Sequence, residues 1–331
     1  MLLKTTFAIS ALSCITLGLV ACQKTEPNKQ IQSSTTDSSV QAQDLKNVTI
    51  GYQKSALTLL ITREQKLLEQ QFPGAQIQWK EFPAGPQTLE ALSVGAIDLG
   101  FVGNTPPIFA QSAGKNIRYA AYEAVPITSQ ALVIAENSPI KTIADLKGRK
   151  IAVQKGSSSH ELLGKILEKA GLTWADITPV WLPPADARAA FDQQAIDAWV
   201  IWDPFLSVAE RDAKAKVLID GSAFAATYQY YIANSKFALA HSEAIGKFIT
   251  ATNQANQWML QHPEPTVKSY AQAIGQDQQI AAQALAKRPK DSIIRTLTAD
   301  IADSQQKIAD SFYQQHLIPK QIKIKDALLS Q

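Results

Sequence analysis

Short apolar runs that alternate with helix-like stretches are the feature that most limits how this chain can fold. The runs show either continuous apolar character or the alternation of apolar and polar residues that is typical of β-strands. Because helical stretches separate many of them, the pattern predicts α/β sheets with crossover helices. The runs are VTIGY (48–52), QIQWKEF (76–82), IDLGFVG (97–103), IRYAAYEA (117–124), QALVIAE (130–136), KIAVQ (150–154), PVWLP (179–183), IDAWVIWD (196–203), KVLID (216–220) and YQYYIAN (228–234).

The helical stretches divide the chain into a mixed region and a purely helical one. After about Asn234 no further strand is expected, and four helical segments lead to the C-terminus, with a break at His262-Pro263. A length of 331 residues suits about two domains. We therefore expect two lobes, with the C-terminal helices packed back on the first. The helices expected between the strands are 57–71, 86–94, 106–113, 159–170 and 185–193.

The first 21 residues have the character of a secretory signal. Lys4 gives a positive start, residues 7–20 are largely apolar, and no acidic residue occurs before Glu26. The segment ends in LVAC, which resembles a bacterial lipoprotein box and implies cleavage before Cys22 and acylation of its thiol. The alternative is an ordinary secretory signal that is cut nearby.

Residues 22–46 are expected to form a flexible polar tether. They are mostly Gln, Ser, Thr, Asn and Lys, with almost no large apolar side chain to bury. Some 25 residues of such coil reach roughly 25–30 Å on average. That is enough to hold a domain just off a membrane.

Composition favours a globular protein and argues against a nucleic-acid-binding one. Hydrophobic residues make up 46% of the chain and charged residues 18%. The formal charge is +3, with scattered lysines and no arginine-rich run, so we expect no nucleic-acid partner.

The stretch KGSSSHELL (155–163) suggests catalysis, but it fits no familiar motif. A nucleophile elbow requires G-x-S-x-G, and a phosphate loop requires a second glycine where Glu161 stands. An H-E-x-x-H zinc motif fails because Gly164 replaces its second histidine. A strand followed by a glycine and a serine-capped helix instead predicts an anion site at a helix N-terminus. Ser158 and Glu161 fit a capping box, so a helix cap without a ligand is the alternative.

Three similar strand-to-helix junctions occur elsewhere, at 82–87, 103–106 and 202–204. Each carries a proline close to the start of the next helix, where the missing N–H costs nothing, and Thr105 is the expected cap of the second. All four junctions follow the C-terminal end of a strand, the edge at which open α/β sheets bind ligands. Asp203 also fits a plain helix cap.

No metal site and no cofactor are expected. The four histidines, at 160, 241, 262 and 316, lie far apart in sequence and show no ligand spacing. One of Trp199 and Trp202, which lie on opposite faces of the same strand, is expected in the core.

Six motifs together closely resemble the periplasmic aliphatic-sulfonate-binding proteins of ABC importers, over about residues 48–320. This resemblance implies a two-lobed solute-binding fold of type II with a ligand cleft between lobes, the first formed by 47–129 with 232–331 and the second by 130–231. The motifs are GYQKS, EFPAGPQTLEALSVGAIDLG, GNTPPIFAQSAG, ENSPIKTIADLKGRKIAVQKGSSSHELL, LPPADARAAF and DAWVIWDPF.

The resemblance also implies a role and a set of contacts. It implies a monomeric periplasmic protein without catalytic residues, which captures an alkanesulfonate for sulfur uptake and delivers it to an ABC permease and its ATPase. One residue departs from the expected motif, because Asn104 stands where we expect an acid. The ligand-facing residues that it implies are Gln53, Ala84, Gly85, Asn104, Thr105, Gly156, Ser157, Ser158, Trp202 and Asp203.

Two alternatives stay open at this point. The same fold could bind another small solute, such as taurine, nitrate or a thiamine precursor. A serine-dependent enzyme is less favoured because His160 is a sequence neighbour of the serines at a helix start, whereas a nucleophile and its base must meet side chain to side chain.

Lipidation of Cys22 leads to a direct prediction. Replacing Cys22 with Ser removes the thiol that would be acylated, so the protein is expected to move from the membrane fraction to the soluble periplasmic fraction. Cell fractionation with immunoblotting measures this. A wild-type protein that is already wholly soluble, with a mature N-terminus elsewhere, would contradict the prediction.

Overall fold

The computed structural model describes residues 45–290 and 292–329. The predicted signal segment, Cys22 and the tether up to residue 44 lie outside the described residues. Each of the ten expected strand runs contains a strand of the structure, so the α/β prediction is confirmed. The strands are β1 (Asn47–Tyr52), β2 (Gln76–Glu81), β3 (Leu99–Val102), β4 (Ile117–Ala124), β5 (Gln130–Ile134), β6 (Lys150–Val153), β7 (Thr178–Trp181), β8 (Ala198–Trp202), β9 (Lys216–Asp220) and β10 (Tyr228–Asn234).

The helices largely follow the predicted ranges. They are α1 (Leu57–Glu64), α2 (Leu67–Gln71), α3 (Gly85–Ser93), α4 (Thr105–Ser112), α5 (Ser158–Lys169), α6 (Pro184–Asp192), α7 (Phe205–Asp212), α8 (Ser235–Ala240), α9 (Ser242–Gln261), α10 (Pro263–Ile274), α11 (Gln278–Ala286) and α12 (Ala299–Gln314). Four short 3₁₀ helices join them: η1 (Ile143–Leu146), η2 (Trp174–Asp176), η3 (Gly221–Ala223) and η4 (Ile324–Ala327).

Two helix predictions need correction. The expected helix 57–71 is two helices, because Lys66 adopts a left-handed backbone with φ of 51° that ends the regular hydrogen bonding between α1 and α2. The described part of the C-terminal region holds five α-helices rather than four, because the six-residue α8 forms directly after β10. Asn234 caps α8 by accepting from the N–H groups of Lys236 and Phe237.

The two sheets share one topology. The first has the order β2-β1-β3-β10-β4, and the second has the order β7-β6-β8-β5-β9. In each sheet the fourth strand of that order runs antiparallel to both of its neighbours, while the first three strands are parallel to one another. These fourth strands are β10 and β5, and the chain enters each of them directly after it crosses from the other sheet.

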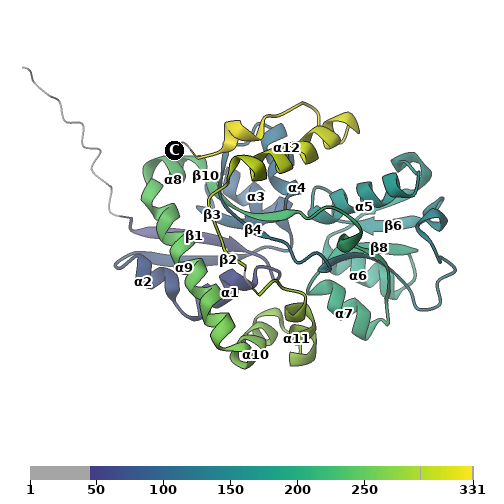
Figure 1. Cartoon of the computed structure of the whole chain (residues 1–331), viewed down its shortest axis with the longest axis horizontal. Coiled ribbons are helices and arrows are strands. Elements are labelled where there is room, and N and C mark those ends of the chain that lie inside the picture. Colours follow the sequence, from purple (N-terminus) through teal and green to yellow (C-terminus); the bar gives the residue numbers. More distant parts are fainter. Residues whose placement is uncertain (1–44, 291, 330–331) are drawn as a thin grey trace, which may run out of the picture. The chain divides into compact units, whose positions relative to one another are not determined.

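The first sheet is covered by helices on both faces (Figure 1). Tyr231 and Ala233 of β10 pack with α1, α9, α10 and α11 on one face. Tyr230 and Ile232 of the same strand pack with α3, α4 and α12 on the other. This alternation is the period of two expected for a strand that is buried on both sides.

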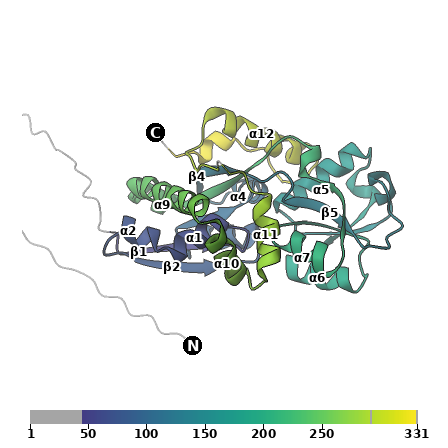
Figure 2. The ribbon, with the colours of Figure 1, turned by 60° about the horizontal axis from the view of Figure 1, so that its bottom comes forward.

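The second sheet is built in the same way, with β5 between α5 and the pair α6 and α7 (Figure 2). Val200 of β8 packs toward α5, whereas Trp199 packs toward α6 and α7 and is 1% exposed. Trp199 is therefore the core tryptophan that the sequence predicted for this strand, and Trp202 is the half-buried one.

The chain passes between the sheets through residues 125–129 and 224–227. The predicted lobe boundary at 231/232 falls inside β10, and all seven residues of this strand pair with β4 in the first sheet. The strand itself is therefore not divided between the sheets. No helix within the described ranges is both long and apolar enough to cross a bilayer.

The helical cover of the first sheet leads to a stability prediction. Phe248 of α9 is 1% exposed and meets the Tyr231 ring edge to face at 5.4 Å. Phe248→Ala is expected to lower the free energy of unfolding by about 3–5 kcal/mol, because it removes a large buried side chain and leaves a cavity. Urea unfolding followed by circular dichroism measures this change.

Leu239→Ala is the matched control for Phe248→Ala. Leu239 lies on α8 and is 73% exposed, so its truncation is expected to change the free energy of unfolding by less than about 0.5 kcal/mol. Equal losses in the two variants would contradict the packing described for this face.

Candidate functional site

A cavity of about 90 Å³ lies where the loops of the two sheets meet. Its walls come from loops at the C-terminal ends of β1, β2, β3, β6 and β8, from the connection 125–129, from the start of β10, and from α10 and α11. The C-terminal edge of parallel strands is the usual ligand site of open α/β sheets. We call this cavity the cleft.

Six of the ten predicted site residues line the cleft, and the other four do not. Gln53, Gly85, Ser157, Ser158, Trp202 and Asp203 form part of its wall. The remaining residues are Ala84, Asn104, Thr105 and Gly156, of which the first three are buried behind the cleft surface.

The N-terminus of α5 offers hydrogen-bond donors to the cleft. Ser157 is the N-cap residue, and its hydroxyl donates to the Gln154 carbonyl at 2.8 Å, so its proton is already used. Within the described residues, neither the Ser158 hydroxyl nor the backbone N–H groups of Ser158 and Ser159 have a hydrogen-bond partner. These groups and the positive end of the helix dipole form a seat for an anion.

The predicted capping box of Ser158 and Glu161 is wrong. The helix begins at Ser158, one residue after the actual N-cap, and no side chain caps it. The Glu161 carboxylate pairs instead with the ammonium of Lys165, one turn further along the helix. Thr105 is likewise not the cap of α4, because Asn104 occupies the N-cap position and Thr105 is the first helical residue.

Two glycines shape the approach of the two sheets' loops. A Cβ atom at Gly103 would lie 1.8 Å from the Ser158 Oγ, so only glycine allows these loops to come this close. Gly156 has a φ of +74° and donates its N–H to the His160 Nδ1 at 3.2 Å. Gly156 is thus a turn residue behind the seat and not part of its wall.

His160 is a buried neutral side chain and not a base. Its ring lies among the aromatic rings of Phe109, Trp174, Trp181 and Phe312, at centroid distances between 5.0 and 5.8 Å. Burial, together with the charge of Lys155, lowers the pKa of His160 to about 3. The imidazole is therefore uncharged at neutral pH, and its Nδ1 is occupied by the Gly156 N–H.

Asn104 and Thr105 serve the contact behind the cleft. The Asn104 Oδ1 accepts the Thr105 hydroxyl at 3.0 Å, and the Asn104 amide lies beside the Glu161 carboxyl. Burial raises the pKa of Glu161, while Lys165 and the Asn104 amide act in the opposite direction. The side-chain amide of Asn104 therefore faces the carboxyl group of Glu161, which belongs to α5 beside the second sheet.

Asp203 reaches the cleft, but its charge is engaged. Its Oδ1 accepts from the Ser207 N–H at 3.0 Å and from the Ser207 hydroxyl at 2.6 Å, which caps the first turn of α7. Its Oδ2 lies 3.1 Å from the Lys287 Nζ, which also pairs with Glu210 at 3.4 Å. One oxygen of this carboxylate thus satisfies an N–H group in the first turn of α7, although Pro204 and not Asp203 occupies the N-cap position.

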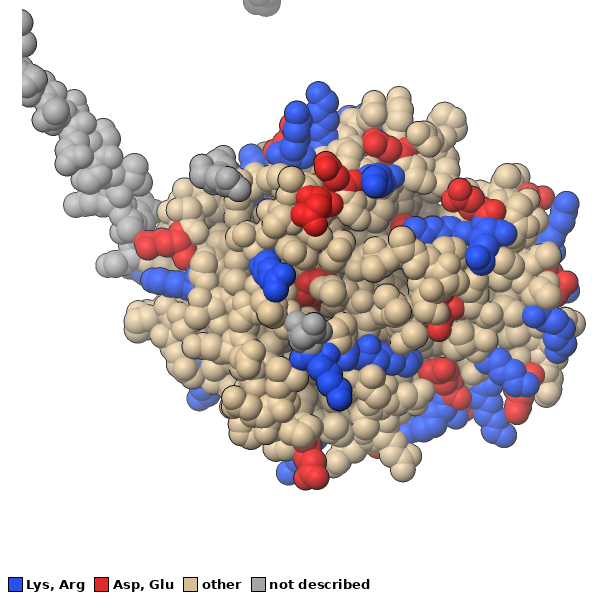
Figure 3. Space-filling view, in the orientation of Figure 1, with Lys and Arg blue, Asp and Glu red and all other residues tan. Residues whose placement is uncertain are grey.

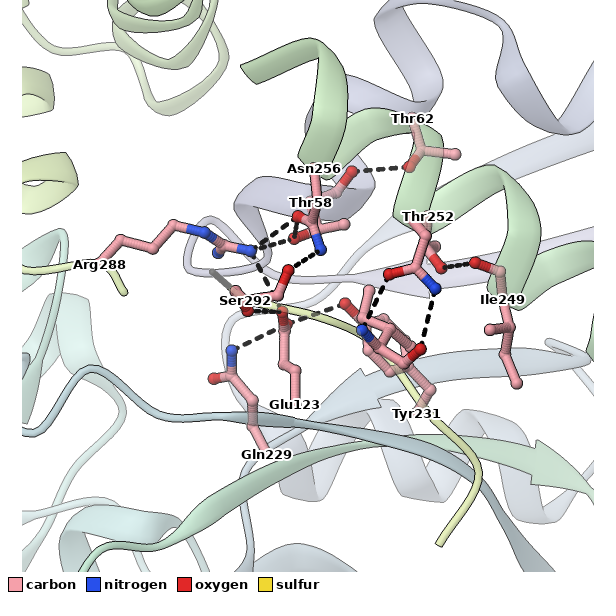
Figure 4. A network of polar contacts seen from close by, with 12 residues as sticks. Thr58, Thr62, Glu123, Gln229, Tyr231, Ile249, Thr252, Asn256, Arg288 and Ser292 are labelled. Carbon is pink, nitrogen blue, oxygen red and sulfur yellow. Dashed lines mark hydrogen bonds and ion pairs between the residues drawn. The ribbon is translucent and has the colours of Figure 1, made fainter. Parts of the chain in front are cut away.

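Arg288 is the second charged residue of the cleft wall and is also paired (Figure 4). Its Nη2 donates to the Thr58 Oγ1 at 2.6 Å, to the Asn256 Oδ1 at 3.0 Å and to the Glu123 Oε2 at 3.1 Å. Glu123 is 1% exposed, and its carboxylate also accepts hydrogen bonds from the side chains of Gln229, Tyr231 and Ser292. Every charged side chain of the cleft wall therefore has an opposite charge beside it.

Several residues of the wall were missed in the sequence. The C-terminal contributors Tyr270, Leu285 and Arg288 carry no local signal, because only the packing of α10 and α11 brings them to the cleft. Gly103, by contrast, directly follows the C-terminal end of β3, and Gln229 is the second residue of β10. The C-terminal strand ends that indicated the other residues could have indicated Gly103, but not Gln229, which lies at the start of its strand.

The described residues hold no group of three or more His, Cys, Asp or Glu side chains that could bind a metal ion. On the face shown in Figure 3, Lys and Arg side chains are interleaved with Asp and Glu and do not gather in one region.

Comparison with known proteins agrees with this geometry. A family model described as NMT1/THI5 like matches residues 74–266. A putative aliphatic sulfonates-binding protein of Escherichia coli K12 is 43% identical over 84% of this chain and 87% of its own length. Its counterpart from Bacillus subtilis is 32% identical over 86% of each chain.

The solved structures include a protein with the same fold throughout. The alkanesulfonate-binding protein SsuA from Xanthomonas axonopodis pv. citri, solved with bound MOPS, is 39% identical and has a TM-score of 0.84. The match covers 87% of this chain and 99% of that protein. The two-lobed solute-binding fold of type II is thereby confirmed, and the chain belongs to the NMT1/THI5-like family and, within it, to the periplasmic aliphatic-sulfonate-binding proteins.

Proposed function

We propose that this protein is the extracytoplasmic solute-binding component of an ABC importer and that it captures aliphatic sulfonates for sulfur uptake. The observation that carries the proposal is the cleft itself, in which free neutral donors stand at the start of α5 while Asp203 and Arg288 are already ion-paired. The relatives at 43% and 32% identity are named for the same class of ligand.

The free donors suit the head group of a sulfonate. A sulfonate is charged at every physiological pH and presents three acceptor oxygens. Hydrogen bonds to a charged group contribute about 1.5–3 kcal/mol each, and micromolar affinity needs only about 8 kcal/mol. The Ser158 hydroxyl and the N–H groups of Ser158 and Ser159 supply three such bonds, and the dipole of the 12-residue α5 adds to them.

The rest of the wall suits an apolar tail. Leu57, Phe101, Trp202, Tyr270 and Leu285 all line the cleft. Trp202 is half-buried and stands edge-on to Phe205 at 6.2 Å, which holds its ring in place. An alkyl chain that leaves the donors of α5 therefore meets apolar surface.

The paired charges argue against taurine as the principal ligand. An ammonium group needs a carboxylate that is free to receive it, whereas Asp203 is held by Lys287 and Ser207. Nitrate and a thiamine precursor fit less well than a sulfonate, because nitrate has no tail to occupy the apolar wall and the donors of α5 favour an anion.

The same contacts argue against a serine-dependent enzyme. A nucleophilic serine needs a base within hydrogen-bond reach. His160 instead accepts from the Gly156 N–H, and its pKa of about 3 reflects its burial. We therefore propose a protein that binds its ligand and turns nothing over; incubation with ester and sulfonate substrates tests this, since any released product would contradict it.

The partners and the location complete the proposal. An ABC permease and its ATPase would receive the ligand, and a monomeric protein anchored by lipid at Cys22 would work in the periplasm. Calorimetric titration with C2–C8 alkanesulfonates, taurine, sulfate and nitrate tests the ligand class. Saturable binding of alkanesulfonates is expected, and binding of only nitrate or taurine would overturn the proposal.

Binding of a sulfonate should depend little on pH between about 5 and 9. The ligand has no proton to lose in this range, His160 stays neutral because its pKa is about 3, and burial raises the pKa of Tyr270 so that its hydroxyl keeps its proton. Titration of butanesulfonate at several pH values measures this. A tenfold loss of affinity within the window, with the circular dichroism spectrum unchanged, would reveal an ionisable contact.

Ser158 offers the sharpest mutational test of the anion seat. Ser158→Ala removes a charge-assisted hydrogen bond and is expected to weaken binding roughly 10- to 150-fold. Ser158→Asp places a negative charge at the start of α5, where the helix dipole tolerates it, so sulfonate binding should be lost while stability stays equal to that of the similarly sized Asn variant. Calorimetry and urea unfolding measure the two effects separately.

Ser158→Asn is the matched control, because asparagine has nearly the shape of aspartate without its charge. Both variants crowd Gly103 equally, so a difference in affinity between them reports the charge. The Asn variant is expected to bind sulfonates better because it lacks the negative charge. If the Asp variant binds alkanesulfonates within threefold of wild type, the anion sits elsewhere in the cleft.

A further inference from the structure

A second cavity lies directly behind one end of the cleft. It has a volume of about 440 Å³ and is lined by α9, α10 and the end of α11 with the residues that follow it. Leu285 and Arg288 line both this outer cavity and the cleft. A side chain that borders two cavities is the wall between them, so one layer of side chains separates the two spaces.

Both spaces have apolar side chains near Leu285, while Arg288 is the charged residue of the wall. On the cleft side, Tyr270 and Ala284 of α10 and α11 adjoin Leu285. On the outer side, the lining includes Met259, Leu260 and Val267. A hydrocarbon chain that passed the wall would therefore leave one apolar surface for another.

The two wall residues are held in different ways. The Arg288 guanidinium is fixed by hydrogen bonds to Thr58, Asn256 and Glu123, and its charge is needed beside the buried Glu123. Leu285 is half-buried on α11 and is held by packing against the core of the first sheet. Leu285 is therefore the part of the wall that can change without leaving a charge unpaired.

We propose that Leu285 sets the upper length of the ligand tail, an inference that rests on the proposed function. A sulfonate head at the N-terminus of α5 directs its tail toward the apolar wall that α10 and α11 provide. The cleft has only about 90 Å³ of free space, whereas the space beyond Leu285 is about 440 Å³. Tail length is then limited by this one side chain and not by the extent of apolar surface.

Linear alkanesulfonates from C2 to C10, titrated below their micellar concentrations, test the inference by calorimetry. In wild type, affinity should rise about fourfold per methylene, the equivalent of about 0.8 kcal/mol, until the tail reaches Leu285. Beyond that length it should level off or fall. Leu285→Ala should bind the short sulfonates no more tightly than wild type, because it removes part of the apolar cleft wall, but its affinity should continue to rise for at least two further methylenes, about 16-fold in all.

Two variants guard against a trivial change in fold. Leu285→Phe enlarges the wall and should shift the length limit downward, which is the opposite of the effect of Leu285→Ala. Val267→Ala truncates an apolar side chain that lines the outer cavity alone, so the length limit should stay at its wild-type value. Urea unfolding of each variant shows whether it is folded.

The outcomes separate this inference from the proposed function. If wild type binds butanesulfonate but Leu285→Ala and Leu285→Phe both keep its length limit, Leu285 is not the determinant and the inference fails alone. If Val267→Ala moves the limit as Leu285→Ala does, the effect is not specific to the wall and the inference is likewise overturned. If wild type binds no sulfonate of any length, the proposed function itself fails.

Discussion

One buried carboxylate, that of Glu123, connects the parts of the molecule that define the cleft (Figure 4). Glu123 is the last residue but one of β4, just before the chain leaves for the second sheet, and Gln229 lies in β10 just after it returns. Their side chains bond at 2.9 Å, and Arg288 brings the C-terminal segment to the same carboxylate. A buried charge left without its partner is strongly destabilising, so both connections and the C-terminal segment are held in one arrangement.

This arrangement explains how an anion can be bound in a cleft that contains both Asp203 and Arg288. Each of these side chains is neutralised by a partner that lies outside the cleft wall, Lys287 for the first and Glu123 for the second. The field inside the cleft then comes mainly from the dipole of α5 and from oriented N–H and O–H groups. The proposed anion seat therefore depends on these neutral donors and not on a free charged side chain.

The fold could be predicted from the sequence further than the site could. All ten strands coincide with apolar or alternating runs, a signal that is local to each run, although β2, β7 and β9 contain no fully buried residue. The capping box failed because the helix begins one residue earlier than the box requires, with Ser157 at the N-cap, and because the Glu161 carboxylate pairs with Lys165. Arg288 could not be found at all, because its place in the wall depends on the packing of α11.

The presence of Asn104 where an acidic residue is expected can be explained by its contact with Glu161. The Asn104 amide lies beside Glu161, whose pKa burial already raises, and this carboxyl group has one cation, Lys165, beside it. An aspartate at 104 would add a second carboxylate to this buried contact, and two like charges close together cannot both stay ionised at low cost. Asparagine keeps the acceptor for the Thr105 hydroxyl and adds an N–H group toward Glu161. The change from acid to amide therefore removes a like charge from the contact between the two sheets' loops, behind the cleft.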